Sequence, residues 1–147
     1  GEVGGSFQEQ LFKGLPKDLH ASVQMVGAIP HDRLIDEYRQ ATLFVIPSLF
    51  DNFPNTCLEA MSCGSAIVGS DTGGIREMLD DGKCGSLFPP GDSNRLAECL
   101  IGLLQAPDRL KELGEKARSR AVREYSLDTI LERTVDYYER MVGVNRS

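Results

Sequence analysis

Asp51 and Glu59 are the residues of this sequence whose type and spacing best suit a chemical role. They lie eight residues apart, one in a loop that follows a buried strand and one in the helix expected after it. N–H groups at a helix start have no intrahelical partner, and the helix dipole adds about half a positive charge, so a phosphate binds well there. Ionised carboxylates repel phosphate but accept hydrogen bonds from hydroxyl groups. The combination is the pattern expected of a nucleotide-sugar site.

The same residues also have a purely structural interpretation. Thr56 and Glu59 have the spacing of a capping box, in which Glu59 would reach back to the N–H group of Thr56. Asp51 and Asn52 form a common turn pair. Spacing alone favours this structural interpretation over a ligand site.

The surrounding segment changes the balance, because it resembles the motif of two acidic residues separated by seven others in family 4 (group 1) retaining glycosyltransferases. The common form is a strand, Pro-Ser, Glu-Gly-Phe-Gly, three residues and Leu-Glu-Ala-Met-x-x-Gly. The resemblance covers about residues 22–142. Matches in order and spacing are Pro47-Ser48, Phe53, Leu58-Glu59-Ala60-Met61, Gly64, Ala66-Ile67-Val68, Ser70, Gly73-Gly74, Glu77, Gly82, Gly85, Asp92, Leu96-Ala97 and Tyr125-Ser126.

The resemblance implies roles for individual residues. Asp51 and Glu59 would be the two carboxylates of the catalytic motif. Glu59 would accept hydrogen bonds from the nucleotide ribose, and Asp51 would contact hydroxyl groups of the donor sugar. The segment between them would bring backbone N–H groups toward the sugar and diphosphate. Gly73 and Gly74 would line a neighbouring loop, although ordinary turn geometry explains that pair equally well. The implied substrate-binding residues are Ser48, Asn52, Phe53, Pro54, Asn55, Thr56, Thr72, Gly73 and Gly74.

Two departures from the family pattern bear on the sugar. Asp51 replaces the usual Glu, which shortens the side chain by about 1.5 Å. Pro54 replaces a Gly and has no N–H group to donate. Both changes can alter which sugar fits, and neither removes the ribose contact. The variant resembles a subset of bacterial polysaccharide-building members.

Alternating strand-like and helix-like stretches predict the α/β fold class: a Rossmann-like parallel sheet with flanking helices and a helical C-terminal segment. Loops at the carboxyl ends of the strands are then the expected ligand sites. Strands are predicted at residues 22–26, 42–46, 66–69 and 84–88. Helices are predicted at 31–41, at 57–63, from the 71–74 loop to about residue 79, after Asp92, from Pro107 to about Glu124 with a solvated charged face, and after Ser126.

Composition excludes several other functions. A net charge of −6 argues against a nucleic-acid surface. The four cysteines form no C-x-x-C pair and are expected to be reduced structural thiols. His20 and His31 complete no metal-ligand spacing and are expected on the surface or at helix caps. We therefore expect no cofactor and no metal.

The chain is expected to be one part of a larger enzyme. Gly1 to Gly5 resemble the middle of a chain, so residues 1–147 are expected to form a partial C-terminal nucleotide-sugar-binding domain. Its first strands and an N-terminal acceptor domain, for a glycan or lipid-linked sugar, would be absent. The fragment would be inactive and could dimerise through an exposed strand edge. The expected location is the cytoplasm, or the inner membrane surface as a peripheral full-length enzyme. The alternatives are a non-catalytic binding or assembly module and a nucleotide-sugar epimerase.

Overall fold

The computed structural model describes residues 5–143 of the chain, which divides into two compact units. The first unit ends at Leu34 and contains the helix α1 (Gly5–Gly14) and a 3₁₀ helix, η1 (Lys17–Ser22). In η1 the His20 ring forms a 2.9 Å hydrogen bond with the backbone carbonyl of Leu15 and packs edge-on against Phe12. These contacts give His20 a structural role within the first unit.

The strand predicted at residues 22–26 does not form, which corrects the predicted strand number from four to three within the described part of the chain. The backbone at Val23 is extended, with φ −110° and ψ 121°, but residues 23–30 join no ladder. An apolar run alone cannot make a strand, because its N–H and C=O groups need a neighbouring strand as partner. Val26 is accordingly 51% exposed.

The second unit is built on a three-stranded parallel sheet. Its strands are β1 (Phe44–Ile46), β2 (Ile67–Ser70) and β3 (Ser86–Phe88), in the order β1-β2-β3. Phe44 lies opposite Ile67, and Ser70 lies opposite Phe88. Every residue of β2 is buried, as expected for a central strand covered on both faces. The predicted α/β fold class, with a parallel sheet and flanking helices, is confirmed.

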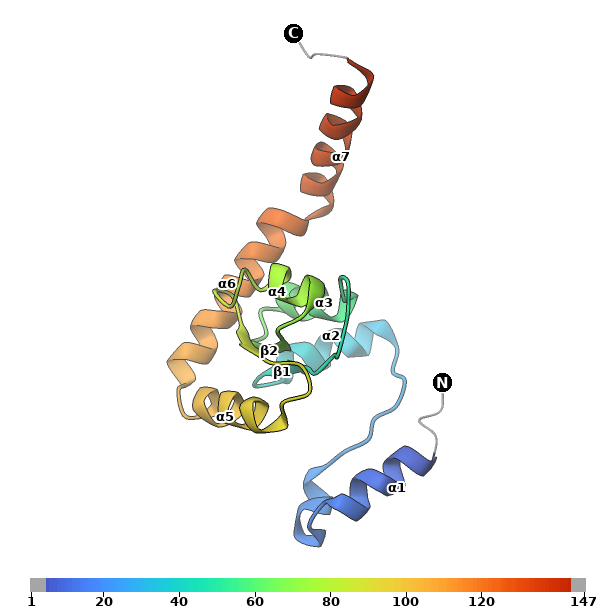
Figure 1. Ribbon diagram of the computed structural model, residues 1–147, viewed down its shortest axis with the longest axis vertical. Coiled ribbons are helices and arrows are strands. Elements are labelled where there is room, and N and C mark those ends of the chain that lie inside the picture. The colour runs from blue at the N-terminus through green and yellow to red at the C-terminus, as the bar shows by residue number, and fades with distance from the viewer. Residues whose placement is uncertain (1–4, 144–147) are drawn as a thin grey trace. The chain divides into compact units, whose positions relative to one another are not determined.

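Helices alternate with the strands and cover both faces of the sheet. Val68 of β2 packs with Phe88, Leu103 and Leu113 on one face, whereas Gly69 lies against Ile75 on the other. Figure 1 shows α5 on one side of the strands and α3 and α4 on the opposite side. The helices are α2 (His31–Gln40), α3 (Asn55–Cys63), α4 (Gly73–Met78), α5 (Ser93–Leu104), α6 (Pro107–Tyr125) and α7 (Leu127–Val142).

Several predicted helix boundaries are confirmed by their caps. Gly64 ends α3 in the left-handed conformation, with φ 79°. The Asp92 carboxylate accepts a 2.9 Å hydrogen bond from the Arg95 N–H at the start of α5. Ser126 caps α7 in the same way through the N–H group of Thr129. Pro107 occupies the first turn of α6, where no N–H donor is needed.

The two C-terminal helices differ in burial. The predicted solvated face of α6 is only part of its surface, because Leu113, Gly114, Ala117 and Ala121 are buried. Small residues there allow α6 to lie close to α3: a Cβ added at Gly114 would overlap the carbonyl oxygen of Gly64. No residue of α7 is buried. None of the helices in the described range is long and apolar enough to cross a membrane.

Candidate functional site

The loops that carry the predicted site residues leave two neighbouring strands. Residues 47–54 follow β1 and lead into α3, while residues 71–72 follow β2 and lead into α4. Because β1 and β2 are parallel and paired, both loops leave the sheet at its carboxyl edge. The fold therefore brings the Asp51 segment and the Gly73-Gly74 segment to one place.

The two loops are in direct backbone contact. The N–H group of Gly74 donates a 3.1 Å hydrogen bond to the carbonyl oxygen of Asp51. A Cβ at Gly73 would overlap that same oxygen, and a Cβ at Gly74 would overlap the carbonyl oxygen of Asn52. Gly73 also has a positive φ of 47°. Turn geometry accounts for Gly73, and the close approach of the Asp51 loop requires glycine at both positions.

Asp51 is held within its own loop. Its Oδ1 atom accepts a 3.2 Å hydrogen bond from the N–H group of Phe53, the local turn that Asp residues commonly form. The Asp51 side chain is half-buried, whereas Asn52 beside it is exposed. The carboxylate thus lies at the surface of the loop with a defined orientation.

The start of α3 differs from the capping-box interpretation. The N-cap residue is Pro54, whose side chain forms no capping hydrogen bond, and the helix begins at Asn55. Thr56 lies inside the first turn, not at the N-cap position that a capping box requires. Asn55 and Thr56 are exposed, so the first N–H groups of α3 lie at a surface beside the Asp51 loop.

Glu59 is half-buried on α3 and contacts a residue that the sequence analysis did not select. Its Oε2 atom accepts a 3.1 Å hydrogen bond from the hydroxyl group of Tyr38 on α2. Burial, followed by the hydrogen bond to Glu59, raises the pKa of Tyr38 to about 12. In the sequence, Tyr38 falls on the same helix face as the apolar residues Leu34 and Ile35. The polar hydroxyl on that apolar face was the available signal, because a buried phenol needs a hydrogen-bond partner.

The remaining predicted residues lie on the same two loops. Ser48 and Thr72 are half-buried where their strands end. Pro54 is buried beneath the start of α3. The Phe53 ring packs edge-on against Tyr125 at the end of α6, with ring centroids 5.4 Å apart. The Phe53 ring therefore anchors the loop to α6.

Cys57 lies next to this site, but its thiol is unreactive. Its thiol is fully buried, and burial, with a smaller contribution from the Asp51 charge, raises its pKa to about 12. A neutral buried thiol is a poor nucleophile. All four cysteines are free thiols, and no cluster of three or more His, Cys, Asp or Glu suited to a metal occurs among residues 5–143.

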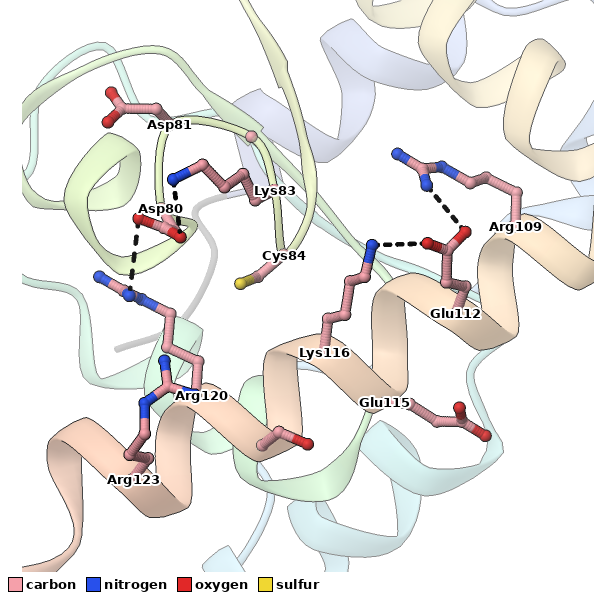
Figure 2. A pocket seen from close by; sticks show the side chains of 12 residues that line it. Asp80, Asp81, Lys83, Cys84, Arg109, Glu112, Glu115, Lys116, Arg120 and Arg123 are labelled. Atoms are coloured by element: carbon pink, nitrogen blue, oxygen red, sulfur yellow. Dashed lines mark hydrogen bonds and ion pairs between the residues drawn. The ribbon is translucent and has the colours of Figure 1, made fainter.

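A hollow of about 780 Å³ lies between the 80–84 turn and α6 (Figure 2). It shares no lining residue with the predicted site. Each of its five basic side chains is paired with a carboxylate. Lys116 and Arg109 both pair with Glu112, at 2.5 Å and 2.8 Å. Lys83 and Arg120 both pair with Asp80, at 3.2 Å and 3.6 Å.

Comparison of the fold places the chain among GT-B glycosyltransferases. The structure is similar to sucrose-phosphate synthase from Thermosynechococcus elongatus, with a TM-score of 0.82 and 28% identity over 95% of this chain and 35% of that one. It is also similar to Anabaena HepE, solved in complex with UDP, with a TM-score of 0.80 and coverage of 92% and 37%. At 21% identity the second likeness shows the fold alone.

The sequence comparison gives the family. The chain belongs to the glycosyl transferases group 1, whose family model matches residues 3–120. It is 36% identical over 119 residues to alpha-maltose-1-phosphate synthase of Mycolicibacterium smegmatis, covering 77% of this chain and 31% of the relative. It is 34% identical over 120 residues to D-inositol 3-phosphate glycosyltransferase 2 of Catenulispora acidiphila, covering 82% and 28%. The chain thus spans less than a third of the length of these relatives.

Proposed function

We propose that this chain forms the donor-binding half of a retaining glycosyltransferase, which moves a sugar from a nucleoside diphosphate to an acceptor in polysaccharide or glycolipid biosynthesis. The observation that carries the proposal is the contact between the Asp51 carbonyl and the Gly74 N–H group. This contact joins the two loops at the carboxyl edge of the sheet beside the start of α3. Membership of the glycosyl transferases group 1 supports the same function.

Each part of a sugar nucleotide has a matching group in this proposal. Glu59 accepts hydrogen bonds from the ribose hydroxyl groups, and Asp51 accepts them from the sugar. The first N–H groups of α3, at Asn55 and Thr56, face the diphosphate. Pro54 lacks an N–H group, so the sugar-facing part of the loop relies on its neighbours.

The proposed chemistry needs positioning and charge stabilisation. The bond between the anomeric carbon and the diphosphate oxygen breaks, and the diphosphate leaves with the bonding electrons. The acceptor hydroxyl oxygen forms the new bond to the anomeric carbon from the same face, and its proton passes to the leaving diphosphate. The dipole of α3 stabilises the leaving charge, while the two carboxylates hold the ribose and sugar in place. No metal or cofactor is included in this scheme.

The acceptor site belongs to another part of the whole enzyme in this proposal. Cations for the diphosphate would also come from that part, so the isolated chain is expected to bind donor weakly and to transfer no sugar. The proposed location is the cytoplasm, where nucleotide sugars are made. HepE was solved with UDP and with UDP-glucose, so uridine nucleotides are the first ligands to test here.

A titration tests the proposal. The whole enzyme is titrated with UDP, GDP and their common sugar conjugates by calorimetry, alongside Glu59→Ala and Glu115→Ala. Glu115 is an exposed carboxylate on α6 and serves as the control. Binding of one nucleotide that is lost in Glu59→Ala and kept in Glu115→Ala supports the proposed site. Binding that is insensitive to Glu59→Ala, or no binding of any nucleotide, contradicts it.

A further inference from the structure

Tyr38 is the single buried residue of α2, and it is joined to the candidate site across the fold. Its hydroxyl group donates to Glu59 Oε2 over 3.1 Å, although the two residues are 21 positions apart in the chain. The motif that contains Glu59 therefore depends on a helix that precedes β1.

The phenol is fixed from several directions. The ring of Tyr38 packs edge-on against Phe44 of β1, with ring centroids 5.1 Å apart and planes at 83°. The backbone carbonyl of Tyr38 accepts a 2.8 Å hydrogen bond from the Ser65 hydroxyl group. The residue is only 4% exposed. Its hydroxyl group is thus a donor held in one place before any ligand arrives.

We propose that Tyr38 is a positioning residue that orients the Glu59 carboxylate for the ribose hydroxyl groups of the donor nucleotide. The inference rests on the proposed function of Glu59 as the ribose acceptor. A free glutamate side chain samples several rotamers and loses that freedom when it binds a ligand. A hydrogen bond to one carboxylate oxygen restricts this freedom in advance, and a carboxylate has about four acceptor positions in total.

The chemical state of Tyr38 suits this task. Burial and the hydrogen bond to Glu59 raise its pKa to about 12, so the hydroxyl group stays protonated and remains a donor throughout the neutral range. Tyr38 also stands apart from the reacting atoms in the proposal, because it acts only through Glu59. The expected effect of its loss is therefore on nucleotide affinity and on the recognition of ribose.

The test uses Tyr38→Phe in the whole enzyme, which removes the hydroxyl group and keeps the ring against Phe44. Tyr137→Phe, an identical deletion at a residue 60% exposed on α7, is the matched control. The measured quantities are the Kd of UDP and GDP, the Kd of their 2′-deoxy and 3′-deoxy forms, and KM and kcat for the sugar donor. Glu59→Ala and the double variant Tyr38→Phe/Glu59→Ala are measured alongside.

We expect Tyr38→Phe to raise the Kd of the nucleotide that binds by about tenfold. This is the size of effect expected for the loss of a hydrogen bond to a charged group. The preference for ribose over deoxyribose should shrink, and KM should rise with little change in kcat, because ribose is held equally in ground and transition states. In the Glu59→Ala background, Tyr38→Phe should add nothing.

Three results separate the two hypotheses. If binding depends on Glu59 but Tyr38→Phe leaves affinity and ribose preference unchanged, the positioning role is wrong and the proposed function stands. Additive losses in the double variant overturn the positioning role equally. If neither nucleotide shows binding that depends on Glu59, the proposed function fails and the inference about Tyr38 fails with it.

Discussion

The backbone N–H group of Gly74 donates to the backbone carbonyl of Asp51 over 3.1 Å, which joins the loop after β1 to the start of α4. The contact is possible because neither Gly73 nor Gly74 carries a Cβ. A side chain at either position would push the Asp51 loop away from the sheet edge. The geometry of the candidate site is therefore set by the backbone of two adjacent loops as much as by its carboxylates.

Gly74→Ala is expected to disrupt this junction. The added Cβ would overlap the Asn52 carbonyl oxygen, so the loop must move and the hydrogen bond to Asp51 is lost. Overpacking of this kind destabilises by roughly 1–3 kcal/mol. If the loop forms the proposed donor site, nucleotide affinity should fall by about tenfold or more. Calorimetric titration of a variant with a native circular dichroism spectrum measures this, and unchanged affinity would contradict the role of the junction.

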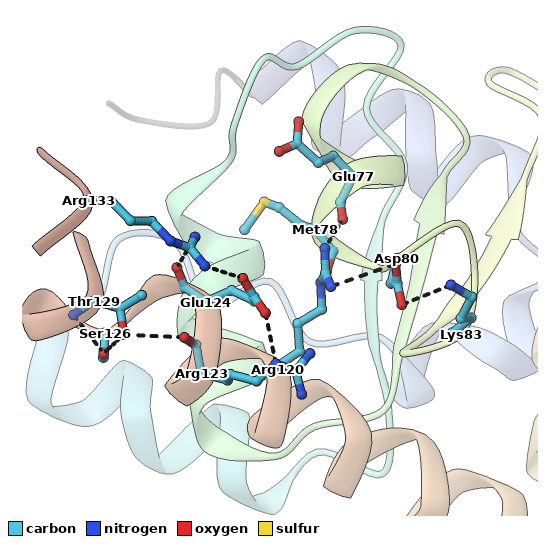
Figure 3. Close-up of polar contacts among 10 residues, drawn as sticks. All are labelled: Glu77, Met78, Asp80, Lys83, Arg120, Arg123, Glu124, Ser126, Thr129 and Arg133. Atoms are coloured by element: carbon cyan, nitrogen blue, oxygen red, sulfur yellow. Dashed lines mark hydrogen bonds and ion pairs between the residues drawn. The ribbon is translucent and has the colours of Figure 1, made fainter. Parts of the chain in front are cut away.

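Arg120 is expected to be the most important charged residue of α6 for stability, and Figure 3 shows why. Its guanidinium donates to the carbonyl oxygens of Met78 and Glu77, both at 3.0 Å, and lies 3.6 Å from the Asp80 carboxylate. The first two are terminal carbonyls of α4, which lack intrahelical donors. The Arg120 side chain is only 16% exposed, and its contact with the Met78 carbonyl is partly buried, whereas its contact with the Glu77 carbonyl is exposed.

Arg120→Ala should lower the free energy of unfolding by about 1–3 kcal/mol, because the partly buried carbonyl of Met78 loses a charged donor. Arg120→Lys should recover little, since one ammonium cannot reproduce the planar fork that reaches both carbonyls. Arg118→Ala is the control: Arg118 is exposed on the same helix and makes a 3.2 Å hydrogen bond to the Ser62 carbonyl. Urea unfolding measures all three variants. A loss in Arg118→Ala equal to that in Arg120→Ala would contradict the argument.

Local patterns in the sequence predicted most of the second unit, because helix caps and buried strands leave clear signals. Gly64, Asp92, Pro107 and Ser126 mark boundaries that the structure confirms. Errors arose where the outcome depends on a distant partner. Residues 22–26 have an apolar pattern but no strand beside them in the described part of the chain.

In the candidate site too, the local segments could be predicted but the contact between distant residues could not. The resemblance located the Asp51 loop and the start of α3, and the parallel sheet explains why they share an edge with Gly73. The Tyr38 contact with Glu59 could not be predicted, because it joins residues far apart in sequence whose side chains meet only after α2 and α3 pack. Spacing along a chain indicates which face of a helix is apolar, but not which partner that face meets.

Because of Tyr38, the free energy of unfolding is predicted to fall at alkaline pH. Its folded pKa of about 12 is above the unfolded value of about 10, so the folded state holds the phenol proton more tightly. The stabilisation is complete below about pH 10 and is lost as the pH rises to about 12. Unfolding in urea at several pH values measures this loss, and Tyr38→Phe should reduce it. The buried Cys57 thiol, whose pKa is also raised to about 12, contributes in the same direction, so some dependence should remain. An unchanged profile in Tyr38→Phe would contradict the prediction.

Two helical glycines should respond in opposite ways to the same substitution. Gly102 lies within α5, and a Cβ built there meets nothing within 4 Å, so Gly102→Ala should stabilise by about 0.5–1 kcal/mol through helix propensity alone. Gly114 gains the same propensity in α6, but its Cβ would overlap the Gly64 carbonyl oxygen where α6 crosses α3. The main chain there cannot move as a flexible side chain can, so Gly114→Ala should destabilise by roughly 1–3 kcal/mol despite the gain. Thermal unfolding of both variants measures the difference in sign, and stabilisation by Gly114→Ala would show that the two helices are less closely packed than described.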